Sequence, residues 1–168
     1  RLVGSEMCIR DRFLMMDDFR NDHPNQYSKG FPWHPHRGIE TITYVLKGTV
    51  AHADSLGNFG DLSDGDIQWM TAGSGIIHQE MPKGDKNGHM HGFQLWANLP
   101  SADKMTTPRY QDIKSKEIRI LEEDDGSKIK VIAGNFKGVK GPVDNISADP
   151  HYLDIFVPAG MSKRFPFD

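Results

Sequence analysis

From Phe31 onward, the chain consists of short apolar or alternating segments separated by Gly, Asn and Asp residues. A period of two residues bounded by turn residues is typical of antiparallel strands, whereas a helix repeats its apolar positions every three or four residues. We expect strands at 41–46, 67–70, 76–80, 93–96, 118–121, 128–132 and 152–157. The pattern therefore predicts an all-β fold, either a sandwich or a barrel.

The composition excludes several classes of protein. With 37% hydrophobic and 26% charged residues, the 168-residue chain is neither disordered nor a disulfide-rich miniprotein. Its net charge of -3, without a basic cluster, argues against direct nucleic-acid binding. No apolar run approaches the ~20 residues that span a bilayer. We therefore expect no membrane association. The single cysteine, Cys8, cannot form an internal disulfide, so we expect a reducing, cytoplasmic location.

The two ends of the chain differ from its middle. Residues 1–12 show no periodicity, and we expect them to be a disordered or foreign N-terminal extension. The stretch 134–150 contains three Gly and two Pro residues and is the natural linker. The strand expected at 152–157 follows this linker with no obvious partner, so it is interpreted as the opening strand of a second, incomplete domain with an exposed edge.

The strongest chemical signal is a pair of triplets, His34-Pro35-His36 and His78-Gln79-Glu80. Residues i and i+2 of a strand point to the same side, so each triplet presents two candidate ligands to one face. Three imidazoles and one carboxylate suit a divalent transition metal such as iron, manganese, nickel, cobalt, copper or zinc. Because Pro35 removes a ladder hydrogen bond, we expect His34 and His36 at a sheet edge or a strand start.

Other histidines and one carboxylate are alternatives. His89 and His91 have the same spacing as the first pair, but glycines flank them, and we expect a loop there. The remaining histidines are expected at the surface or in hydrogen bonds: His23, His52 and His151. Glu40 shares the parity of His36, so it is either a ligand in place of Glu80 or, as we prefer, an acceptor that orients an imidazole.

Aromatic and sulfur side chains near these triplets are expected in the core, and some of them would wall a pocket beside the ion: Trp33, Tyr44, Trp69, Met70, Phe93 and Trp96. Gln68 and Gln94 are the polar candidates for such a pocket. Alternation alone does not decide which of these side chains face the interior.

Three blocks of the sequence carry a family resemblance: FPWHPHRGIETITYVLKG, GDLSDGDIQWMTAGSGIIHQEMP and HGFQLWANLP. They resemble the N-terminal half of the pirin family, within the cupin superfamily. The resemblance runs from Phe13 to Val157 and includes the late segment YLDIFV. It implies a cupin-type, jelly-roll-like antiparallel β-barrel at residues 13–146, followed at 147–168 by the end of a linker and the first strand of a truncated second barrel.

The resemblance also implies a metal and an activity. In pirins, the two motifs hold a non-haem iron, which implies His34, His36, His78 and Glu80 as ligands and Fe(II) as the metal. One implied activity is a dioxygenase that opens a small aromatic, flavonol-like substrate, with Glu80 as both ligand and base. The alternative is a non-catalytic regulatory module that binds a protein partner, and a eukaryotic regulator of that kind would fit a nuclear location.

Two departures from a generic cupin matter. Thr71 replaces a usual proline, and His78 lies one residue further from Gly73. Both features are similar to pirins, which take the carboxylate from the second motif, and this weakens Glu40 as a ligand. Pirins also resemble two stacked barrels, whereas this sequence contains little of a second one.

Overall fold

The computed structural model describes residues 12–165. The chain divides into two compact units between Ser115 and Lys116. The expected extension 1–12, with Cys8, lies outside the described residues except for Arg12. The sequence interpretation placed the boundary after residue 146, which is later than this division.

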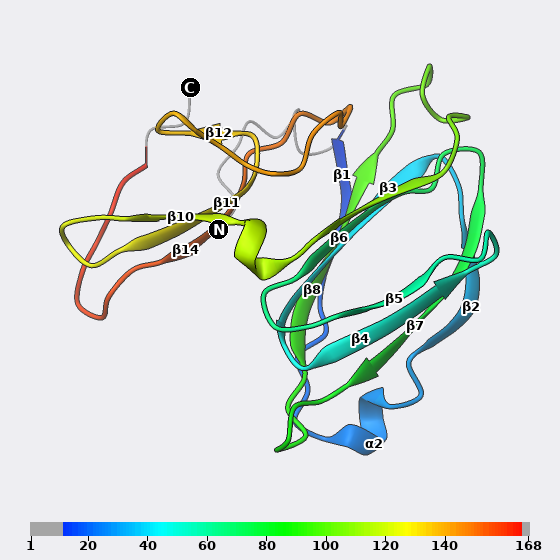
Figure 1. Cartoon of the computed structure of the whole chain (residues 1–168), viewed down its shortest axis with the longest axis horizontal. Coiled ribbons are helices and arrows are strands. Elements are labelled where there is room, and N and C mark those ends of the chain that lie inside the picture. Colours follow the sequence, from blue (N-terminus) through cyan, green and yellow to red (C-terminus); the bar gives the residue numbers. More distant parts are fainter. Residues whose placement is uncertain (1–11, 166–168) are drawn as a thin grey trace. The chain divides into compact units, whose positions relative to one another are not determined.

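The first unit contains two antiparallel sheets (Figure 1). The five-stranded sheet has the order β1-β8-β3-β6-β9, with bounds β1 (Phe13–Asp18), β8 (His91–Asn98), β3 (Ile39–Lys47), β6 (Ile67–Thr71) and β9 (Arg109–Ile113). The four-stranded sheet has the order β2-β7-β4-β5, with bounds β2 (Phe31–His36), β7 (Ile76–Lys83), β4 (Thr49–Asp54) and β5 (Phe59–Leu62). The short helix α2 (Pro24–Tyr27) precedes β2.

The β-branched segment at the centre of β3 forms the middle of the larger sheet. β3 pairs with β8 on one side and β6 on the other, so Thr43 lies between Gln94 and Gln68 in register. The all-β prediction is confirmed, and the strands divide between two sheets rather than closing into one hydrogen-bonded ring. Pro35 lies in the edge strand β2, as expected for a residue that donates no ladder hydrogen bond.

Two buried apolar clusters each combine residues from both sheets. One buried cluster combines Val45, Val50, Leu62 and Met90, and Phe19 and Tyr27 pack against it. A second cluster combines Met70, Ala72 and Ile76 with Tyr110. Buried polar residues of β2 and β7, namely His36, His78 and Glu80, alternate with more exposed positions on these strands.

The second unit is a small sheet of three strands with the order β10-β11-β14. Their bounds are β10 (Arg119–Glu122), β11 (Lys128–Ala133) and β14 (Tyr152–Phe156), and a two-stranded ribbon is formed by β12 (Asn135–Phe136) and β13 (Val139–Lys140). The short 3-10 helix η1 spans Ser115–Glu117. Ile129, Val131 and Phe136 form the buried centre of this unit.

The last strand has a partner that the sequence interpretation missed. β14 pairs antiparallel with β11, placing Ile155 opposite Ile129. The hairpin of β10 and β11 was expected to complete the first barrel, but it lies in the second unit and shares its sheet with β14. β14 has one neighbour in this sheet, so its other side is an edge, as expected.

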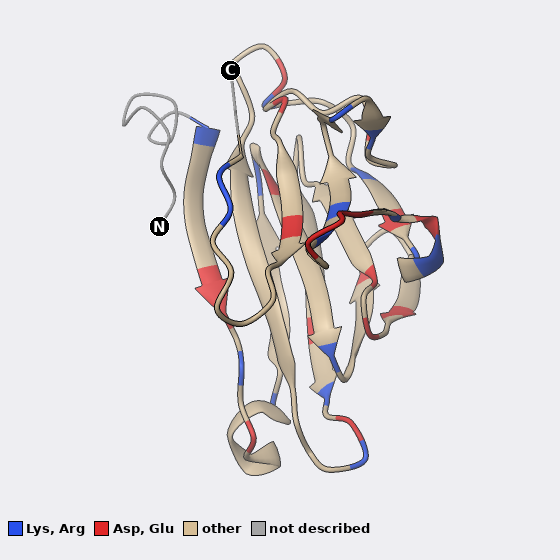
Figure 2. Cartoon of the chain, turned by 90° about the vertical axis from the view of Figure 1, so that its left-hand side faces the viewer, with Lys and Arg blue, Asp and Glu red and all other residues tan. Residues whose placement is uncertain are grey.

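Charged side chains of both signs are interspersed along the chain (Figure 2). In this view, blue and red segments occur on both strands and loops, and most of the strand residues are tan. Within residues 12–165, no helix has the length and apolar character needed to cross a membrane.

Candidate metal centre

Two neighbouring strands bring the predicted histidines together. β2 and β7 are antiparallel, and His34 lies directly opposite His78 in their register. His36 lies two residues further along β2 and therefore points to the same side as His34. A register irregularity between Phe31 and His34 shifts the start of β2 relative to β7.

The three imidazole rings form a compact group. Their centroids are 4.8 Å apart for His34 and His36, 4.4 Å for His34 and His78, and 5.0 Å for His36 and His78. One candidate ligand atom from each ring lies within 4.8 Å of the others. Within the described part of the chain, this is the group of three or more His, Cys, Asp or Glu residues that could hold a metal.

Buried nitrogen atoms in this group have no hydrogen-bond partner. They are Nε2 of His36 and both ring nitrogens of His78, whose side chains are 8% and 1% exposed. An unsatisfied buried polar atom costs about 1–3 kcal/mol, so such atoms call for an explanation. A metal ion coordinated by His36 Nε2 and by one ring nitrogen of His78 supplies one for two of the three atoms, and the residues present therefore fit a divalent transition metal.

His34 is held in one tautomer by its own strand. Its Nδ1 lies 2.8 Å from the carbonyl oxygen of Pro32. Because a carbonyl only accepts hydrogen bonds, Nδ1 carries the proton and donates it, which leaves Nε2 with a free lone pair. Metal-binding imidazoles in proteins are commonly oriented by a hydrogen bond of this kind.

Burial keeps the other two rings neutral. The pKa of His36 is lowered to about 4, first by burial and then by His78 and His34, while Glu80 acts in the opposite direction. The pKa of His78 is also lowered to about 4, by burial and then by His34 and His52, against the effect of Asp54. Only a neutral imidazole can ligate a metal, so these shifts favour binding at neutral pH.

Glu80, the fourth predicted ligand, lies beside the imidazoles but is held by other side chains. It shares the inner face of β7 with His78 and is 3% exposed. Thr43 Oγ1 donates to its Oε1 over 3.0 Å. Gln94 Nε2 donates to Oε1 over 3.1 Å and to Oε2 over 2.9 Å. The group of mutually close ligand atoms contains the three histidines and not this carboxylate.

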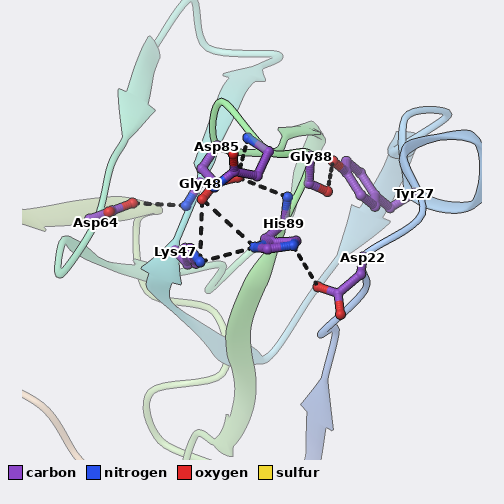
Figure 3. A network of polar contacts seen from close by, with 9 residues as sticks. Asp22, Tyr27, Lys47, Gly48, Asp64, Asp85, Gly88 and His89 are labelled. Carbon is purple, nitrogen blue, oxygen red and sulfur yellow. Dashed lines mark hydrogen bonds and ion pairs between the residues drawn. The ribbon is translucent and has the colours of Figure 1, made fainter.

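The second H-x-H pair lies away from this group. His89 belongs to a loop network in which its Nδ1 contacts Lys47 Nζ over 3.0 Å, and its Nε2 lies 4.0 Å from Asp22 (Figure 3). Asp85 contacts Lys47 in the same network, over 3.3 Å. His91, at the start of β8, lies 3.8 Å from Asp18. His89 lies in a loop, as expected, whereas His91 is the first residue of β8 and not part of a loop.

The role that we expected for Glu40, as an acceptor that orients an imidazole, is wrong. Glu40 Oε1 accepts a hydrogen bond of 2.7 Å from Thr71, and no imidazole contacts it in the described bonds. The parity argument failed because His36 ends β2 and Glu40 lies in β3, with a turn at Gly38 between the two strands. Within β3, Glu40 and the inward-facing Thr43 are three residues apart, so they lie on opposite faces.

The remaining candidates divide between core and surface. Three of the predicted core residues are at most 2% exposed, namely Tyr44, Trp69 and Met70, whereas Trp33 is 53% exposed. Of the single histidines, His52 is buried and lies 2.8 Å from Gln68 Nε2, as expected for a hydrogen-bonded ring. Sequence reasoning missed strand β4, although the alternation in its sequence TVAHAD was a visible signal.

Comparisons with known proteins agree with this geometry. The family profile described as Pirin matches residues 2–97. A Pseudomonas aeruginosa protein with a provisional quercetin 2,3-dioxygenase name is 48% identical over 99% of this chain and 60% of its own length. The chain thus spans less than two thirds of this relative.

Solved structures have the same fold. A quercetin 2,3-dioxygenase from Acinetobacter baumannii is 38% identical, with a TM-score of 0.73 over 83% of this chain and 50% of that one. A bacterial pirin from Escherichia coli, solved in complex with nickel(II), is 26% identical, with a TM-score of 0.53 over 75% of this chain and 58% of that one. The cupin fold predicted from the motifs is confirmed, and this chain belongs to the pirin family.

Proposed function

We propose that this chain carries the metal centre of a non-haem, Fe(II)-dependent dioxygenase that acts on flavonol-like substrates. The observation that supports it most is the group of three imidazoles, two of which have buried nitrogens without a hydrogen-bond partner, beside a buried carboxylate. The names of the Pseudomonas and Acinetobacter relatives give the substrate class. Manganese, nickel, cobalt, copper or zinc would suit the same nitrogen and oxygen donors.

The proposal assigns the roles of metal ligand and general base to the predicted site residues. His34, His36 and His78 would hold the ion, and Glu80 would be the fourth ligand. When bound, the ion would supply Lewis-acid chemistry for a chelating substrate and redox chemistry for dioxygen. Glu80 is also the base that would accept the proton of a flavonol hydroxyl, because its carboxylate shares the buried inner face of β7 with His78.

A small pocket adjoins Glu80 and gives the substrate a place to approach. Phe31, Thr43 and Gln94 contribute to its lining, together with Asp17, Phe19, Val50 and Pro82. Its volume is about 10 Å³, well below the ~300 Å³ at which small-molecule sites begin. Phe31 is 45% exposed, so we expect its ring to move aside when a flavonol enters.

Turnover of quercetin tests this proposal. The iron-loaded chain is mixed with quercetin without oxygen, and oxygen is then admitted. We expect loss of the flavonol absorbance and release of carbon monoxide, and a His78→Ala variant as control should give neither. Unchanged absorbance with iron bound would contradict the enzymatic proposal.

A metal-dependent binding module is the second proposal, and exposed apolar side chains on the metal-bearing sheet favour it. Trp33, next to His34, is 53% exposed, and Ile77, next to His78, is 48% exposed. Exposed apolar groups of this kind are common at protein-protein interfaces. If Trp33→Ser leaves turnover intact but abolishes capture of a defined partner by the metal-loaded chain, this second function is supported. Equal capture by the wild type and His78→Ala would exclude a metal-dependent interaction.

A further inference from the structure

We propose that Gln94 is a positioning residue which, oriented by Trp96 and assisted by Thr43, sets the position of the Glu80 carboxylate and thereby the metal affinity of the site. This inference rests on the proposed metal centre and extends it to residues outside the ligand set. The three residues act through Glu80, so they are distinct from the histidines that would contact the ion.

The first step is the pattern of hydrogen bonds on Glu80. Gln94 Nε2 reaches both carboxylate oxygens, over 3.1 and 2.9 Å, and Thr43 Oγ1 donates to one of them over 3.0 Å. Because Glu80 is 3% exposed, water does not replace these donors readily. Hydrogen bonds to a buried ionised group are among the stronger ones in proteins.

The second step is the orientation of the Gln94 amide. The indole Nε1 of Trp96 lies 3.1 Å from Gln94 Oε1. An indole nitrogen only donates, so the amide oxygen must face Trp96 and the amide nitrogen must face Glu80. A flipped amide would place two oxygen acceptors against each other at Glu80 and two donors against each other at Trp96. Trp96 therefore determines which end of Gln94 meets the carboxylate.

The third step is the connection of this group to the imidazoles. The Trp96 ring lies edge-on to His36, with centroids 5.0 Å apart. Trp96 and Gln94 are two residues apart on β8 and point to the same side, toward β2 and β7 of the four-stranded sheet, respectively. One short strand segment thus contacts a histidine of the site and orients the donor on its carboxylate.

The fourth step is rigidity. Thr43 and Gln94 are direct register partners on β3 and β8, and β3 is the central strand of its sheet. Groups supported by paired strands hold their positions more narrowly than groups on loops. Since hydrogen bonds of ligating carboxylates typically change metal affinity 10–100-fold when removed, the same range is expected for Gln94.

Cobalt(II) binding tests the inference without turnover. Competition with a chromophoric chelator gives the dissociation constant, and the visible Co(II) spectrum reports the coordination of the ion. Gln94→Met keeps the length of the side chain and removes its amide, so we expect about 10–100-fold weaker binding and a changed spectrum. Gln26→Met is the matched control, because Gln26 lies in α2 and bonds Asn21 and not Glu80. It should bind cobalt as the wild type does.

A double-mutant cycle shows whether Gln94 acts through Glu80. In a Glu80→Gln background, Gln94→Met should weaken cobalt binding no further, because the coupled partner is already gone. Equal affinity of the wild type and Gln94→Met, or a full additional loss in the Glu80→Gln background, would overturn the inference while leaving the metal centre intact. No cobalt binding by the wild type would instead refute the proposed function, and this inference with it.

Trp96→Phe is the second variant, for use if Gln94→Met fails to fold by circular dichroism. It removes the indole N–H and keeps an aromatic ring beside His36. We expect a loss of cobalt affinity in the same direction and smaller than the loss from Gln94→Met. Wild-type affinity and an unchanged Co(II) spectrum in a folded Trp96→Phe protein would overturn the role given to Trp96 and Gln94.

Discussion

His34 and His78 are direct partners across the β2–β7 ladder, and their ring centroids are 4.4 Å apart. Two positions far apart in sequence thus become neighbours through one strand pairing. His36 joins them because it lies two residues along the same strand. The integrity of this single ladder therefore determines whether the three imidazoles meet.

Replacing one histidine of the centre should remove the metal. We expect His78→Ala to lower metal content after purification to a small fraction of one ion per chain, because two ligands on β2 do not compensate for the lost nitrogen. Elemental analysis measures this content. His23→Ala, which changes a histidine outside the centre, should retain the wild-type value. Equal metal content in the two variants would contradict the site.

Acid should destabilise the metal-free chain. The pKa values of His36 and His78 are lowered to about 4 from 6.5, so the unfolded chain binds more protons between these two pH values. The free energy of unfolding should therefore fall as the pH is lowered from 6.5 through 4. Urea unfolding with a chelator present measures it. In the double variant His36→Gln/His78→Gln, the decline over this pH range should be shallower, and an identical decline would contradict the assignment.

Leu62 should contribute strongly to the stability of the first unit. It is 1% exposed and packs in one cluster with Val45, Val50 and Met90. Leu62→Ala should lower the free energy of unfolding by about 2–5 kcal/mol, because it removes buried methyl groups and leaves a cavity. Leu56→Ala, at a position that is 60% exposed, should change it by less than about 0.5 kcal/mol. Chemical denaturation distinguishes the two.

Gly73 should tolerate no side chain. Its φ is +49°, and an added Cβ would collide with the carbonyl oxygen of Thr106. Its own carbonyl accepts a hydrogen bond of 2.8 Å from the amide of Gly38, two residues after His36. Gly73→Ala should therefore lower both the melting temperature and the metal affinity.

Gly57→Ala is the control for Gly73→Ala. Gly57 also has a positive φ, +88°, but open space surrounds its Cβ position. Its substitution should cost only the conformational strain of about 1–2 kcal/mol, and metal affinity should not change. If both variants lose equal stability, the steric argument for Gly73 is wrong.

Sequence alone predicted the fold class and the three histidines that the structure brings together, because both predictions depend on short-range spacing. Alternation with period two predicted strands, and H-x-H spacing placed two imidazoles on one face. Pro35 predicted the edge strand for the same local reason, since a missing N–H affects its own ladder. The family motifs added the cupin architecture.

Tertiary structure decided the contacts of Glu40, Gln94 and β14. A turn at Gly38 separates His36 from Glu40, so parity along the sequence did not carry over from one strand to the next. The contact of Gln94 with Glu80 depends on which faces of two different sheets meet. β14 pairs with β11, from which the 134–150 linker separates it in sequence. Such long-range pairings follow from the packing of whole sheets, and no local pattern of residues encodes them.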